Sequence, residues 1–195
     1  MIISPILHKK TPKQNTIITI SLFSLYLLTA IIDFFTIKKV PFQATVMALG
    51  ALIAFFFIFS RINSIYYFGI LGFAFFAQYF GAMLNFYEII PIYDLLLHFS
   101  SGILLVFMSH FIYQLLISKC KKSDVPICIT IAFCLFMTIS SAAVWEIWEY
   151  AGDVLLGLSS QGTGVADTMT DIIAGTTGGI IGSIVLYFMI RKRKI

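Results

Sequence analysis

The stretch ICITIAFCLFMTISSAAVWEIWEY, residues Ile127 to Tyr150, decides the fold. It carries no charged side chain before Glu146. An α-helix needs about 20 mostly apolar residues to cross a hydrocarbon core about 30 Å thick. The stretch therefore predicts a membrane-spanning helix with acidic residues at one end.

Five further stretches of the chain have the same length and apolar character. They run over Ile17 to Ile37, Phe42 to Ser60, Ile65 to Tyr87, Leu95 to Ser118 and Thr168 to Ile190. All six are too long and too continuous for barrel strands, which alternate over about 10 residues. Since helices satisfy their own backbone inside lipid, we predict an all-α, polytopic six-helix transmembrane bundle. It forms a single integral membrane domain, residues 1–195, and its first span is a retained anchor rather than a cleaved signal peptide.

The composition supports this fold class and excludes others. Hydrophobic residues make up 59% of the chain and charged residues only 11%, whereas soluble domains carry about a quarter charged residues. The composition therefore excludes a soluble enzyme and a nucleic-acid-binding protein.

The basic residues predict the orientation of the bundle. Six spans place both termini on one side, and cytoplasmic termini put all Lys and Arg residues inside except Lys38 and Lys39. An excess of Lys and Arg marks cytoplasmic loops. We therefore expect a multi-pass protein of the inner or plasma cell membrane.

Most acidic residues fall on the opposite, outer side, although acidic residues contribute little to orientation. On the fourth span, His98 follows Asp94 by one helical turn. Glu146 and Glu149 lie at the outer end of the fifth span, and Asp171 lies just inside the sixth. The sequence thus predicts that three helices bring these side chains into one shallow layer at the outer boundary.

Ionisable groups at this depth are costly unless they are hydrated or paired. Clustered carboxylates share protons, bind a cation or stay hydrated, and carboxylates with a histidine suit zinc or a harder divalent ion. We predict that His98, Glu149 and Asp171 hold a divalent metal and that Glu146 is a general base. The alternative is structural, with Asp167 capping the sixth helix and Asp171 stabilised by the helix dipole.

Two features flank the acidic layer. Trp145 and Trp148 are typical of the aromatic belt at a membrane interface. The sixth span carries Gly178-x-x-x-Gly182 and Gly175-x-x-x-Gly179-x-x-x-Ser183, two small-x-x-x-small patterns that let helices approach closely. This spacing predicts packing that holds Asp171 against the neighbouring spans, packing alone, or a homodimer contact.

Several motifs in the last three spans resemble a known family. They are Tyr93-Asp94-x-x-x-His98-Phe99-x-x-Gly102, Glu146-x-x-Glu149-Tyr150, Gln161-Gly162 and Asp167-Thr168-x-x-Asp171, followed by Gly178. The combination resembles the YjdF-like family of uncharacterised bacterial inner-membrane proteins and, more loosely, VanZ-like membrane proteins. The resemblance adds Asp94, Gln161 and Asp167 to the candidate polar site, but it implies no reaction.

The leading hypothesis is a bacterial membrane protein with a metal-dependent polar site that acts on a lipid or lipid-linked envelope substrate. If it is an enzyme, we expect a hydrolase or transferase. A proton- or cation-coupled transporter is one alternative, although transporters place their sites near the membrane midplane. A non-catalytic scaffold or immunity-type factor is the other.

Overall fold

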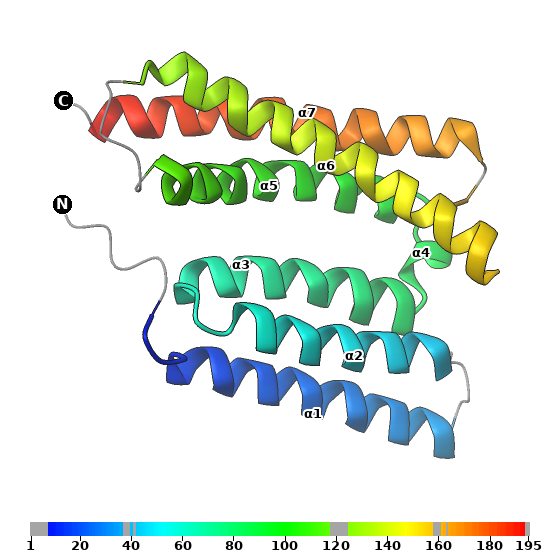
Figure 1. Cartoon of the computed structure of the whole chain (residues 1–195). Coiled ribbons are helices and arrows are strands. Elements are labelled where there is room, and N and C mark those ends of the chain that lie inside the picture. Colours follow the sequence, from blue (N-terminus) through cyan, green and yellow to red (C-terminus); the bar gives the residue numbers. More distant parts are fainter. Residues whose placement is uncertain are drawn as a thin grey trace. The chain divides into compact units, whose positions relative to one another are not determined.

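The computed structural model describes residues 8–36, 40, 42–117, 125–157, 161–162 and 164–193. These residues form seven α-helices and one π-helix (Figure 1). In chain order they are α1 (Lys13–Phe35), α2 (Phe42–Phe59), α3 (Ser64–Phe75), η1 (Phe76–Met83), α4 (Phe86–Ile89), α5 (Tyr93–Ile117), α6 (Ile127–Leu156) and α7 (Val165–Arg193).

The prediction of an all-helical, multi-pass membrane protein is confirmed at this level. Within the described residues, five helical segments are long and apolar enough to cross a membrane: Lys13–Phe35, Ser64–Met83, Tyr93–Ile117, Ile127–Leu155 and Val165–Lys192. A sixth apolar segment, Thr45–Phe59, is shorter. The count of six spans and the cytoplasmic termini stay predictions. Lys38, Lys39, Lys119, Lys121, Lys122 and Lys194, which enter the orientation argument, lie outside the described residues.

The chain divides into two compact units, Met1–Tyr93 and Asp94–Ile195, and each is described by itself. In the first unit a buried polar side chain links α1 to the end of α2. The Asn15 side-chain amide donates hydrogen bonds to the carbonyl oxygens of Ser60 at 2.9 Å and Ile62 at 3.0 Å. These carbonyls belong to the residues that follow α2, which ends at Phe59. Asn15 therefore satisfies two backbone acceptors of the connection between α2 and α3.

The third helix of the first unit ends earlier than hydropathy predicts. The apolar stretch continues to Tyr87, but α3 passes into η1, which ends at Met83. Asn85 then adopts the left-handed conformation with φ of 62° and precedes the short α4. Asparagine tolerates this conformation better than most residues because its short polar side chain bonds locally, and here it donates to Glu88 at 2.6 Å.

The second unit consists of α5, α6 and α7, which run side by side (Figure 1). Glycines bring α5 and α7 into close backbone contact. A Cβ atom at Gly102 on α5 would collide with the carbonyl oxygen of Gly175 on α7, and one at Gly178 would collide with the carbonyl oxygen of Phe99. Val106, Cys134 and Leu186 form the buried apolar core below this contact.

The glycine-rich side of α7 therefore packs against other helices of the same chain, as the close-packing prediction expected. Gly175, Gly179 and Gly182 are buried, and their neighbours are residues of α5 and α6. A homodimer contact through α7 would have to use its exposed side, which carries Ile184 and Phe188.

Candidate metal centre

Three helix ends meet at one end of the second unit. α5 begins at Tyr93, α6 ends at Leu156 and α7 begins at Val165 (Figure 1). Because α6 runs antiparallel to its two neighbours, residues far apart in sequence share one depth. The described acidic residues of this unit lie within about three helical turns of these helix ends.

His98 lies at the centre of the polar residues. Its Nε2 atom is 3.6 Å from Oδ1 of Asp94 on the same helix and 3.7 Å from Oε1 of Glu146 on α6. The Asp94 side chain is 39% exposed, whereas those of His98 and Glu146 are 9% and 4% exposed. The imidazole is thus held below a partly open surface, between carboxylates from two helices.

Potential metal ligands in the described part of the chain form two overlapping groups. Asp94, His98 and Asp171 form one group, and His98, Glu146 and Glu149 form the other. Within each group, one ligand atom of every residue lies within 4.8 Å of the others. His98 belongs to both groups. Ligands of a common ion lie about 3–4 Å apart when their bonds to it are about 2.0–2.6 Å long, so small side-chain movements would complete either group around a cation.

The Glu146 carboxylate is the least satisfied group of the cluster. The residue is 4% exposed, and its buried Oε1 atom has no hydrogen-bond partner among the described residues. Leaving a buried acceptor unpaired is unfavourable, and far more so when the group is charged. This oxygen lies 3.7 Å from Nε2 of His98, beyond hydrogen-bond distance.

Two other acidic residues have a different function, because they hold the loop between α6 and α7. Asp153 accepts a hydrogen bond from the backbone N–H of Gln161, and Asp167 accepts one from that of Gly162, both at 2.9 Å. The Gln161 side chain donates to the Thr168 hydroxyl at 2.9 Å, and Thr168 hydrogen-bonds the Glu146 side chain. The predicted polar residues Gln161 and Asp167 thus organise the loop next to the cluster.

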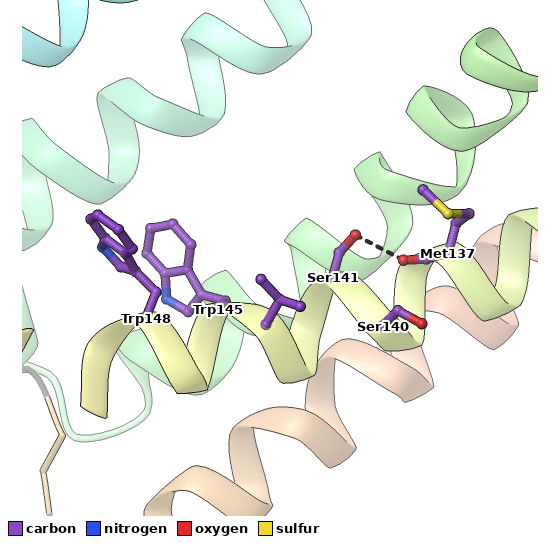
Figure 2. A pocket seen from close by; sticks show the side chains of 6 residues that line it. Met137, Ser140, Ser141, Trp145 and Trp148 are labelled. Carbon is purple, nitrogen blue, oxygen red and sulfur yellow. Dashed lines mark hydrogen bonds between the residues drawn. The ribbon is translucent and has the colours of Figure 1, made fainter. Parts of the chain in front are cut away.

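Trp145 links the cluster to the apolar surface of α6. Its indole Nε1–H donates to Oε1 of Glu149 at 2.8 Å. The same side chain is 51% exposed and lines a groove of about 450 Å³ along the helix. The lining residues recur every three or four positions on one face of α6 (Figure 2): Met137, Ser140, Ser141, Val144, Trp145 and Trp148.

The structure brings the predicted ligands together, but in a different combination. Asp171 groups with Asp94 and His98, whereas Glu149 groups with His98 and Glu146. Spacing along each helix predicted that these residues share a depth, while their grouping depends on side-chain conformations. Sequence reasoning treated Trp145 only as part of an aromatic belt. Its position four residues before Glu149 was the signal of a direct contact on one helix face.

Comparisons with known proteins agree with a membrane protein of uncharacterised function. An uncharacterised protein of Thermotoga maritima is 36% identical over 99 residues, which cover 50% of this chain and 49% of that protein. The chain thus aligns with about half the length of this curated relative. No solved structure matches the chain. The resemblance to YjdF-like proteins is compatible with these findings, although neither match carries that name. Residues 15–192 match the predicted membrane protein family DUF2238, and the chain belongs to that family.

Proposed function

We propose that the ends of α5, α6 and α7 bind a divalent cation at the extracytoplasmic side of the bacterial inner or plasma membrane. In this proposal the protein uses the cation on a lipid or lipid-linked envelope substrate, as a hydrolase or transferase. The observation that carries the proposal is the convergence of Asp94, His98 and Asp171, whose ligand atoms lie within 4.8 Å of one another beside the buried, unpartnered Oε1 of Glu146. An acidic cluster alone would not suffice, because exposed carboxylates are common without an ion.

We assign the ion to Asp94, His98 and Asp171, which form the group that leaves Glu146 free for another task. Carboxylate-rich sites favour hard ions such as Mg²⁺ or Mn²⁺, whereas the single imidazole also suits Zn²⁺. A bound ion of this kind activates water or polarises a phosphoryl or carbonyl oxygen.

Glu146 serves as the general base in this proposal. Its Oε1 atom accepts a proton from the attacking water or hydroxyl group, and its burial keeps the carboxylate away from bulk solvent. Thr168 and Gln161 hold Glu146 in place through the hydrogen bonds described above.

The test is the metal content of the purified, full-length protein after dialysis against Mn²⁺ and then against metal-free buffer. Elemental mass spectrometry measures the bound metal, and we expect about one ion per chain in the wild type. His98→Ala and Asp171→Asn should each reduce this content to background.

Asp167→Asn is the matched control, because Asp167 is an acidic residue of the same helix end that bonds the loop. It should retain the ion. A wild-type protein without Mn²⁺, Mg²⁺ or Zn²⁺, or equal loss in Asp167→Asn and Asp171→Asn, would contradict a specific cation site.

A further inference from the structure

We infer that the groove on α6 holds an acyl chain of a phospholipid whose headgroup carries a primary ammonium, and that Glu149 binds this ammonium. The inference rests on the proposed function and deepens it, because it names the class of lipid that reaches the cation site. Four observations on the second unit support it.

The first observation is the length and depth of the groove. Its lining runs from Met137 to Trp148, and eleven residues of helix rise about 16 Å. This distance matches one leaflet of a hydrocarbon core about 30 Å thick. Trp148 is 71% exposed at the polar end, as expected for a side chain at the headgroup level. The groove therefore extends from the headgroups towards the middle of the membrane, as a lipid chain does.

The second observation is the apolar character of the lining. Val144 and Trp145 are 62% and 51% exposed. The hydroxyl of Ser141 is turned back to the carbonyl oxygen of Met137 at 2.8 Å (Figure 2). Because this hydroxyl is satisfied by its own helix, it does not require a polar ligand. The face presents hydrocarbon and indole surface to whatever fills it.

The third observation is the continuity between the groove and the cluster. Trp145 lines the groove and donates to Glu149, and Glu149 groups with His98 and Glu146. A headgroup attached to a chain in this groove therefore lies next to the Glu149 carboxylate.

The fourth observation is the charge of the cluster. Asp94, Glu146, Glu149 and Asp171 carry four carboxylates, and the sequence has no Lys or Arg in residues 94–118 or 125–190. A divalent ion held by Asp94, His98 and Asp171 leaves the side chains of Glu146 and Glu149 outside its ligands, so acidic groups remain for a second, positively charged partner. An anionic headgroup is then repelled, whereas an ammonium group pairs with a remaining carboxylate. The phosphate of the same zwitterionic headgroup lies next to the cation.

The chain contains two tryptophans, Trp145 and Trp148, and both line the groove. Their fluorescence is therefore a direct probe. The purified protein is placed in phosphatidylcholine vesicles with Mg²⁺, and brominated-chain lipids are titrated in. We expect brominated phosphatidylethanolamine to quench the emission with a relative affinity roughly fivefold higher than that of brominated phosphatidylcholine or phosphatidylglycerol.

Two exposed apolar residues of α6 provide a matched pair of variants. Val144 lines the groove and is 62% exposed, whereas Ile147 is 64% exposed and lies outside the lining. Val144→Phe fills the groove and should remove the preference for phosphatidylethanolamine. Ile147→Phe introduces the same side chain about one turn further along α6, outside the groove, and should preserve the preference.

Glu149→Gln separates the two proposals. It should abolish the lipid preference while the protein retains its ion, because we assign the ion to the other group.

Equal quenching by the three lipids, weak quenching by all of them, or equal effects of Val144→Phe and Ile147→Phe would overturn the inference. Metal content is measured on the same preparations. An ion without lipid preference contradicts this inference alone, and a lipid preference without an ion supports the lipid site but contradicts the proposed function.

Discussion

Oε1 of Glu146 lies 3.7 Å from Nε2 of His98, although the two residues belong to different helices. Both side chains are buried, and Oε1 of Glu146 has no hydrogen-bond partner in the described part of the chain. The position of this buried imidazole beside several carboxylates therefore bears on both the ligand of the second unit and its free energy of unfolding.

Cation binding should stabilise the folded protein. A ligand that binds only the native state at a concentration 100 times its Kd adds about 2.7 kcal/mol to the free energy of unfolding. We expect Mn²⁺ to raise the thermal unfolding temperature of the wild type in detergent and to leave that of Asp171→Asn unchanged. Asp167→Asn should respond like the wild type. A rise of the same size in Asp171→Asn would place the ion elsewhere.

Glu146→Gln should stabilise the metal-free protein. The substitution keeps the shape of the side chain and removes one of the four carboxylates, of Asp94, Glu146, Glu149 and Asp171, that lie around His98. Relief of this repulsion and of the buried charge is expected to raise the free energy of unfolding by roughly 1–3 kcal/mol. Denaturant titrations with EDTA measure the change, and a comparable loss of stability would show that the ion pair with His98 dominates.

Gly102→Ala should weaken the packing of α5 against α7. The added methyl group would collide with the backbone of Gly175, and overpacking of this kind costs about 1–3 kcal/mol. Gly72→Ala is the control, because a Cβ at that helical position meets no atom within 4 Å. Since alanine favours helices over glycine by about 1 kcal/mol, this control should be neutral or stabilising. Equal effects of the two substitutions on unfolding would contradict the close contact.

Asn15→Ala tests the first unit independently. It removes the donor to the carbonyl oxygens of Ser60 and Ile62. Each side-chain hydrogen bond in a membrane protein contributes about 0.6 kcal/mol on average, so we expect the free energy of unfolding to fall by about 1 kcal/mol. Gln14→Ala, at the exposed neighbouring position, should leave the free energy of unfolding nearly unchanged. Metal content should be the same in both variants, because neither residue belongs to the second unit.

Hydropathy predicted the helices well, because the hydrocarbon core of a membrane requires spanning helices to be about 20 residues long and mostly apolar. It could not predict the end of the third helix at Met83, since the following residues remain apolar as far as Tyr87. The change depends on the backbone conformation at Asn85. Hydropathy is also insensitive to the difference between an α-helix and a π-helix.

The candidate site was predictable in depth but not in detail. Helical rise places His98 and Glu146 at the same end of the unit, and the structure agrees. Helical rise could not predict that Asp171 groups with Asp94 rather than with Glu149. That choice depends on side-chain torsions, which in Glu149 are fixed in part by the indole of Trp145.

The contact of Gly102 with Gly175, and of Gly178 with Phe99, places main chain directly against main chain between α5 and α7. The distance between the backbones of α5 and α7 is consequently fixed close to Asp94 and Asp171. Only the side-chain torsions of the two aspartates are left to adjust the distance between their carboxylates. A larger residue at either glycine contact would therefore be expected to separate the two aspartates as well as to lower stability.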